Sequence, residues 1–195
     1  MMTMHANGFT PTEAALVQKE LGAKVVVARA PVAAWWTFYM NMGRKPWDDI
    51  RVRKAVSLAL NRDRAVEVVE EAWGAVGGIM PPGSAYALPA DEVRGIPGFK
   101  KDKAADIAEA KRLLTEAGYP TGFETLTTYR GGRIYEDAAV FMRDQLGQIG
   151  IKAKLQPLET AQLFDTLLKR TYDSAHFKDA ITSRAPDYPM SYFLS

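Results

Sequence analysis

The sequence contains no cysteine and only two histidines among its 195 residues. The lack of cysteine excludes disulfide bonds, zinc–thiolate sites and a cysteine nucleophile, although it does not identify the compartment. The histidines, His5 and His176, are far apart, and neither has a carboxylate at metal-ligand spacing. We therefore expect His176 to be a hydrogen-bonded histidine within a strand, and we expect no free metal ion. Binding of nickel through a small-molecule chelator stays an alternative for the ligand.

Long apolar runs, a leader segment and blocks of like charge are also absent. The apolar stretch at 30–39 is much shorter than a membrane-spanning helix and contains Pro31. Residues 1–7 lack a basic segment followed by an apolar run, so we expect no signal peptide in this chain. The net charge is +2, and acidic and basic residues are interspersed, which argues against nucleic acid or an anionic membrane surface as a partner.

The motifs of common catalytic sites are missing as well. The chain has no Gly-x-Ser-x-Gly, no Walker loop, no Gly-x-Gly-x-x-Gly and no metal triad. Asp63 and Glu67 are four residues apart, but like charges near a helix start usually complement the helix dipole rather than exchange protons. We predict that the protein is not an enzyme and uses no cofactor.

The composition that remains can form a core, with 47% apolar and 25% charged residues. In chain order, the first half predicts a helix at 11–20, a buried strand at 23–29, an aromatic strand at 35–41, a helix capped by Asp49, a helix capped by Asp63 and a long loop at 74–99. The loop is rich in glycine and proline, and loops of this length are usually functional.

The second half of the chain alternates regularly between helices and strands. In order, it predicts a helix after Asp102, a strand at 123–129, a helix at 135–149, a strand at 151–157, a helix at 160–169 and a strand at 173–180. The helix at 160–169 should turn Phe164, Leu167 and Leu168 inward. Such alternation indicates βαβ units, so the predicted fold class is α/β, with a mostly parallel or mixed sheet flanked by helices.

Ligands of such sheets bind beyond the carboxyl ends of the strands. Two segments follow such ends: Arg130, Gly131 and Gly132 after the first strand of the second half, and residues 183–189 after the last. Arg130 could clamp a ligand carboxylate with its planar fork, and Gly131 would let the backbone approach the ligand closely. The alternative for Arg130 is a solvated loop arginine.

Trp35 and Trp36 are neighbours on the aromatic strand, so their side chains should point to opposite faces. One of them could line a ligand site while the other packs in the core. The alternative, which is commoner for any single aromatic residue, is that both pack in the core.

Five blocks of the sequence resemble the dipeptide-, oligopeptide- and nickel-binding proteins of ABC importers, the family 5 solute-binding proteins. In chain order they are DDIRVRKAVSLALNRD at 48–63, PPG at 81–83, AEAKRLLTEAGYPTGF at 108–123, QLGQIGIK at 145–152 and PDYP at 186–189. The first and third blocks are long and specific, and all five stand in the family's order.

This resemblance implies one lobe of a two-lobed clamshell of the type II periplasmic-binding-protein kind. Residues 1–33 would belong to the end of the other lobe and the hinge crossing, residues 34–188 to the main lobe and residues 189–195 to the start of the return crossing. The implied function is capture of a peptide or similar small solute for the permease subunits of an ABC importer, in the periplasm or another extracytoplasmic location. The alternative is the ligand-sensing domain of a transcriptional regulator with the same binding fold.

The resemblance also implies a role for Asp187 and Tyr188. In peptide-binding members, an aspartate before tyrosine in this context pairs with the α-ammonium of the ligand, which a desolvated carboxylate does well. The alternative is a turn aspartate ahead of Pro189. The family's usual upstream Gly-Trp pair is not present in residues 178–185.

A clamshell surrounds its ligand with two walls, and the resemblance implies that this chain supplies one of them. We therefore expect the chain by itself to bind peptides no better than about millimolar. We also expect it to self-associate through the apolar surface of its cleft face.

Overall fold

The computed structural model describes residues 11–27, 34–71, 74–78 and 80–180. Within these ranges the chain forms a four-stranded sheet in the order β1-β4-β2-β3. Its strands are β1 (Ala34–Met40), β2 (Glu124–Arg130), β3 (Lys152–Leu158) and β4 (Ser174–Ala180). β2 is parallel to β3 and to β4, whereas β1 is antiparallel to β4. The predicted α/β fold with a mostly parallel sheet is confirmed.

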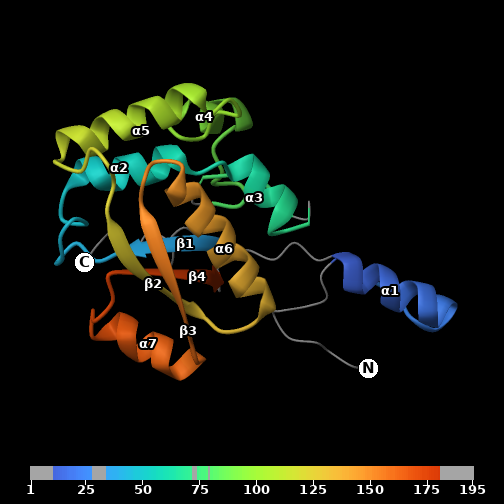
Figure 1. Cartoon of the computed structure of the whole chain (residues 1–195). Helices are drawn as coiled ribbons and strands as arrows, with labels where there is room; N and C mark the ends of the chain where they lie inside the picture. Colours follow the sequence, from blue (N-terminus) through green and yellow to red (C-terminus); the bar gives the residue numbers. More distant parts are fainter. Residues whose placement is uncertain (1–10, 28–33, 72–73, 79, 181–195) are drawn as a thin grey trace.

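Helices cover this sheet on both sides (Figure 1). They are α1 (Pro11–Leu21), α2 (Ile50–Ala59), α3 (Arg62–Val68), α4 (Ala90–Gly95), α5 (Ala104–Glu116), α6 (Arg133–Gly147) and α7 (Thr160–Leu168), with a short 3-10 helix, η1 (Gly22–Lys24), after α1. α2 and α5 pack against each other on one side of the sheet, and α7 lies on the other side. The elements predicted from 102 onward are all present, within a few residues of their expected bounds.

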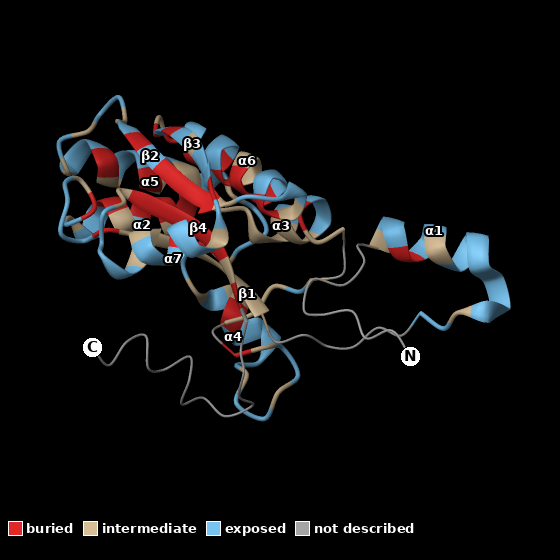
Figure 2. Ribbon diagram, turned by 90° about the horizontal axis from the view of Figure 1, so that it is seen from below, coloured by how far each residue is buried: buried red, intermediate tan, exposed pale blue. Residues whose placement is uncertain are grey.

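Two apolar clusters fill the space between the layers, and Figure 2 shows the buried residues concentrated along β2 and β4. The larger cluster joins α2, α5 and α6 to the sheet, and its largest fully buried members are Trp47, Leu114, Leu146 and Ile151. The smaller cluster consists of Tyr129, Tyr135, Ala139, Leu158, Leu163 and Phe177. Aromatic side chains are therefore concentrated in the smaller cluster, near the end of the sheet where β2 finishes.

α2 begins as its sequence predicts. The side chain of Asp49 accepts a hydrogen bond from the backbone N–H of Arg51, and the predicted inward residues Val52, Val56 and Ala59 are buried. The predicted cap of α3 is wrong, because Asn61 caps this helix by accepting from Arg64 N. Asp63 lies within the first turn and instead binds Arg94 of α4 with two hydrogen bonds.

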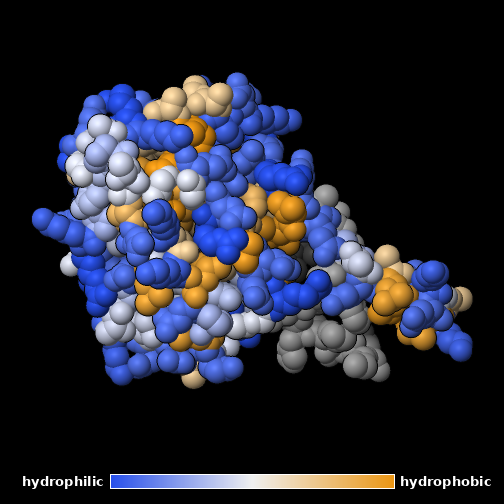
Figure 3. All heavy atoms as spheres, viewed as in Figure 1, coloured by the Kyte–Doolittle hydropathy of each residue, from blue (hydrophilic) through white to orange (hydrophobic). Residues whose placement is uncertain are grey.

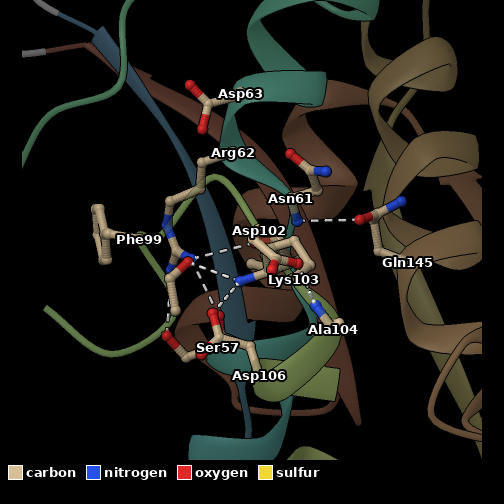
Figure 4. Close-up of polar contacts among 12 residues, drawn as sticks. Ser57, Asn61, Arg62, Asp63, Phe99, Asp102, Lys103, Ala104, Asp106 and Gln145 are labelled. Carbon is tan, nitrogen blue, oxygen red and sulfur yellow. Dashed lines mark hydrogen bonds and ion pairs between the residues drawn. The ribbon is translucent and has the colours of Figure 1, made fainter. Parts of the chain in front are cut away.

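A buried polar cluster holds the start of α3 against the chain that leads into α5 (Figure 4). Arg62 Nη1 donates to the carbonyl oxygens of Ser57 at 3.0 Å and Gly98 at 2.7 Å, and its guanidinium lies 3.9 Å from the centre of the Phe99 ring. Lys103 Nζ donates to Gly98 O and to a carboxylate oxygen of Asp106. Burial lowers the pKa of Arg62 to about 10, and the charge of Asp106 partly opposes that shift.

The predicted strand at 23–29 is wrong over the part that the structure describes. Its first residues belong to η1, and residues 25–27 pair with no strand of the described sheet. Val26 is 92% exposed. A β-branched run becomes a strand only where a neighbouring strand takes up its backbone hydrogen bonds, and no such neighbour lies beside it among the described residues.

α1 confirms the helix predicted at 11–20 and extends away from the body of the protein (Figures 1 and 2). It is tied back at its start, where Thr12 donates from its backbone nitrogen and its hydroxyl to the Glu71 carboxylate at 3.1 and 2.7 Å. Leu16 and Leu21 are exposed, and Figure 3 shows apolar side chains on this projecting helix.

The inward face predicted for α7 is partly wrong. Leu163 is the fully buried residue of this helix, whereas Leu168 is 84% exposed and Phe164 is 43% exposed. Phe164 still contacts Phe177 edge-on at 5.3 Å. The predicted loop at 74–99 contains a helix, α4, which was not expected because its six residues are too few to show a helical period. Among the described helices, none combines the length and the apolar character that crossing a bilayer requires.

Candidate ligand-binding site

The antiparallel course of β1 brings the candidate residues of the sequence to one edge of the sheet. Because β1 starts where β4 ends, Trp35 lies opposite Asp179, and Trp36 lies opposite Lys178. β2 and β3 run parallel to β4 and finish at the same edge, where Arg130 lies opposite Leu158. This carboxyl edge is where ligands bind in open α/β sheets.

Arg130 is the last residue of β2 and is held by an aromatic neighbour. Its Nη1 donates to Tyr135 Oη at 2.8 Å, and its guanidinium carbon lies 5.0 Å from the centre of the Tyr135 ring. The next residue, Gly131, donates its backbone N–H to Leu158 O at 2.8 Å and ties the ends of β2 and β3 together. Arg130 is half-buried, so it differs from the freely solvated loop arginine that was the alternative. A guanidinium has five N–H donors, and among the described residues only the bond to Tyr135 uses one of them.

Trp36 connects that arginine–tyrosine pair to β4. Its ring meets Tyr135 edge-on at 5.7 Å and stacks on His176 at 5.1 Å. Its indole Nε1 donates to Glu70 Oε1 at 2.5 Å, and the same oxygen accepts from Lys178 Nζ at 2.7 Å. Each of these side chains is at least partly withdrawn from solvent, and each contacts another member of the group.

Trp35 and Asp179 lie on the opposite face of the sheet from Trp36 and Lys178, because side chains alternate along each strand. Asp179 is buried, with an exposed fraction of 7%. Its Oδ2 accepts from Thr37 Oγ1 at 2.6 Å and from Tyr39 Oη at 2.7 Å. Asp179 shares its face of the sheet with Phe177, which contacts Phe164 of α7.

His176 is a buried sheet histidine, as its sequence context indicates. Its Nδ1 donates to the carbonyl oxygen of Thr37 at 3.0 Å, and burial lowers its pKa to about 4, so the ring is neutral near pH 7. No group of three or more histidine, aspartate or glutamate side chains within the described ranges could hold a metal ion.

The structure adds residues that the sequence did not single out for the site: Glu70, Tyr135, Lys178 and Asp179. Tyr135 could have been suspected from its place in the first turn of the helix that follows Arg130. Glu70 had no such signal, because it is 34 residues from Trp36 and 108 residues from Lys178. Asp187, Tyr188 and the whole segment 183–189 lie outside the described residues.

Comparison with known proteins identifies relatives over nearly the whole chain. The family model described as "Bacterial extracellular solute-binding proteins, family 5 Middle" matches residues 4–195. Among curated proteins, the glutathione-binding protein GsiB of Salmonella typhimurium is 32% identical over 152 residues, which is 77% of this chain but 27% of that protein. This chain thus spans about a quarter of the length of the curated relatives that it matches.

Two solved structures of similar fold are complexes with bound peptides. OppA of Haemophilus influenzae, in complex with RPPGFSPFR, superposes with a TM-score of 0.79 at 24% identity over 96% of this chain and 37% of that one. The periplasmic protein DppA of Helicobacter pylori, in complex with the peptide STSA, gives a TM-score of 0.77 at 24% identity over 94% and 34%. At this identity the match shows a common fold, that of type II periplasmic binding proteins.

Proposed function

Because the chain belongs to the bacterial extracellular solute-binding proteins of family 5, we propose that it forms one wall of a receptor that captures a peptide or similar small solute. In this proposal the receptor closes two lobes on its ligand in the periplasm, or in another extracytoplasmic location, and delivers it to the permease subunits of an ABC importer. The relatives described above are named as binding proteins, and neither they nor the matched family model favours a transcriptional regulator.

The observation that carries the proposal is the arrangement of Arg130, Tyr135 and Trp36 at the carboxyl edge. A half-buried guanidinium that is oriented by Tyr135 suits a carboxylate of the ligand, since a bidentate pair needs a fixed fork. Trp36 and Tyr135 supply an aromatic surface beside it. We propose that the edge binds the ligand through this group, and that Asp187 and Tyr188 contribute from the segment that follows β4.

We also propose the chain division that the resemblance implies, with residues 1–33 as the end of the other lobe and the hinge crossing, residues 34–188 as the main lobe and residues 189–195 as the start of the return crossing. Closure of that lobe would remove water from the edge and strengthen each ion pair there. With a single wall, an ion pair exposed to water is worth about 0–1 kcal/mol. Binding by this chain should therefore be weak, and the assay has to detect affinities near millimolar.

The test is a titration of the isotopically labelled chain with tripeptides, observed by amide chemical shifts. We expect saturable shifts at the ends of β2 and β4 and a weaker response in Arg130→Gln, which loses the cationic fork. Arg133→Gln is the matched control, because Arg133 lies three residues away, is mostly exposed, and makes a 3.7 Å ion pair with Glu13 of α1. The proposed site would be contradicted if the wild-type chain showed no saturable shifts, or if Arg130→Gln and Arg133→Gln weakened the response to tripeptides equally.

A separate variant tests Asp187. In a protein with both lobes, Asp187→Asn should weaken an amine-bearing ligand by about 2–5 kcal/mol, the usual cost of removing one partner of a desolvated charge pair. Thermal stability without ligand should barely change. Unchanged affinity in calorimetric titration would show that Asp187 is a turn residue only.

A further inference from the structure

Glu70 joins three elements through one of its oxygen atoms. It lies two residues after α3, and its Oε1 accepts hydrogen bonds from Trp36 Nε1 of β1 at 2.5 Å and from Lys178 Nζ of β4 at 2.7 Å. The side chains of Glu70 and Lys178 are 22% and 24% exposed. Salt screens a pair that is withdrawn from water in this way less than it screens a pair on the surface. The Glu70 carboxylate is therefore an effective counter-charge for Lys178.

Lys178 without this counter-charge would give the carboxyl edge a second cation. It lies two residues before the end of β4, and Arg130 ends β2, which is parallel to β4. Trp36 connects the two cations. Lys178 Nζ is 5.2 Å from the centre of the Trp36 ring, and Tyr135, the partner of Arg130, meets that ring edge-on at 5.7 Å. Because Arg130 is held by a neutral hydroxyl and Lys178 by a carboxylate, the two cations differ in the charge that they leave for a ligand.

Glu70 also takes up the polar atom of the aromatic surface. The indole Nε1–H of Trp36 is a donor only, and such a group usually finds an acceptor when it is withdrawn from water. Here the acceptor is Glu70, and the same ring stacks on His176 at 5.1 Å. The surface that Trp36 offers beside Arg130 is thus apolar, and the ammonium next to it is neutralised.

A hydrogen-bond latch between α3, β1 and β4 would not need a charge at position 70. Glutamine has a side chain of the same shape, and its carbonyl oxygen could accept from Trp36 and Lys178 in the same way. What glutamine lacks is the negative charge. The glutamate therefore does more than hold three elements together, because it decides how much positive charge remains beside Trp36.

We propose that Glu70 is a positioning residue that sets the charge specificity of the ligand site. It acts through Lys178 and Trp36 and does not itself touch the ligand. This inference rests on the proposed function, and it describes the ligand more closely: a solute whose carboxylate binds Arg130 and whose neighbouring group, beside Trp36, is uncharged. A second carboxylate next to Trp36 would meet the charge of Glu70 rather than a free ammonium.

The first experiment uses sodium acetate as the probe on the full chain, with sodium chloride at equal ionic strength as the reference. The indole N–H resonance of Trp36, assigned by its loss in Trp36→Phe, and the amide resonances of β4 are followed in the wild type and in Glu70→Gln. Glu67→Gln is the matched control, because it breaks an ion pair with Arg64 on the surface of α3, where the two side chains are 59% and 60% exposed. We expect acetate to bind beside Trp36 about threefold more tightly in Glu70→Gln than in the wild type or the control.

The double variant Glu70→Gln, Lys178→Gln shows which cation is responsible. Removal of Lys178 should abolish the gain in acetate binding, because the ammonium that Glu70→Gln releases is then missing. A gain that persists in the double variant would assign the effect to another group and overturn the proposal.

The second experiment compares the tripeptides Ala-Gln-Ala and Ala-Glu-Ala, which differ by one carboxylate in the middle. We expect the wild type and Glu67→Gln to bind the glutamine peptide more tightly, and Glu70→Gln to shift the ratio by about threefold toward the glutamate peptide. A wild type that prefers the glutamate peptide, or an unchanged ratio in Glu70→Gln, would overturn the role of Glu70 and leave the proposed function intact. An acetate response that depends on Glu70 and Lys178 without any peptide binding would instead sink the proposed function and support the charge role.

Discussion

Gly98 approaches Ser57 so closely that a β-carbon on Gly98 would lie 2.6 Å from the Ser57 carbonyl oxygen. Gly98 also has a backbone φ of +87°, which residues other than glycine rarely adopt. The two carbonyl groups of this pair are held by one donor, Nη1 of Arg62. Conformational freedom at Gly98 is thus what allows the segment before α5 to dock on the end of α2.

Gly98→Ala should destabilise the protein by about 2–4 kcal/mol, from the strained φ and the contact with backbone that cannot move aside. Urea unfolding measures the effect. Gly95→Ala is the matched control, since nothing lies within 4 Å of a β-carbon there and alanine favours the helix α4 that Gly95 ends. Equal stability of the two variants would mean that the Gly98–Ser57 contact relaxes freely.

Arg62→Lys should also be costly, although it keeps the charge. Lysine cannot reproduce a fork that reaches Ser57 O, Ser57 Oγ and Gly98 O together, so buried carbonyl groups lose donors at a cost of about 2–4 kcal/mol. Arg64→Lys, two residues along α3, changes an exposed pair with Glu67 and should alter the unfolding free energy by less than about 0.5 kcal/mol. The same chemical denaturation experiment decides between them, and a loss shared by both variants would contradict the buried role.

Leu163 and Leu168 should differ sharply although both belong to α7. Leu163 is 0% exposed, and Leu163→Ala leaves a cavity beneath the sheet that costs about 2–5 kcal/mol. Leu168→Ala removes a surface side chain and should stay within about 0.5 kcal/mol of the wild type. Thermal unfolding of the pair measures the difference. A larger loss of stability in Leu168→Ala than in Leu163→Ala would contradict the structure and support the inward face predicted from the sequence.

His176 should make the protein sensitive to mild acid. The ring has an ordinary pKa of 6.5 and a folded-state pKa of about 4, so the unfolded chain binds more protons between these values. Stability should therefore be complete above pH 6.5 and fall as the pH drops toward 4, by up to about 3 kcal/mol from this residue.

His176→Asn tests that expectation, because asparagine can donate to Thr37 O without titrating. Urea unfolding at neutral pH and near pH 4.5 should show a smaller loss of stability in the variant than in the wild type. The titrating carboxylates are common to both proteins and cancel in the comparison. Parallel pH profiles would show that His176 becomes protonated without unfolding the sheet.

Local patterns in the sequence predicted most of the elements. The stretch from 102 to 180 alternates strand and helix periods, and each period covers enough residues to be distinguished from the next. The cap of α2 by Asp49 follows from chemistry within a few residues. The strand at 23–29 failed because a strand depends on a neighbour, and the inward face of α7 failed because Leu163, Leu167 and Leu168 offer more than one apolar stripe.

The sequence by itself thus determined the order and type of most elements, the family and the segments after β2 and β4, since all of these are written in neighbouring residues. Only the tertiary structure decided which side chains meet at the edge. Because β1 runs antiparallel to β4, Trp35 lies opposite Asp179, which is 144 positions away in the sequence. The segment after α3 places the Glu70 carboxylate where it accepts hydrogen bonds from both Trp36 and Lys178. Those contacts depend on strand register and helix packing, which are settled by burial over the whole domain rather than by any local pattern.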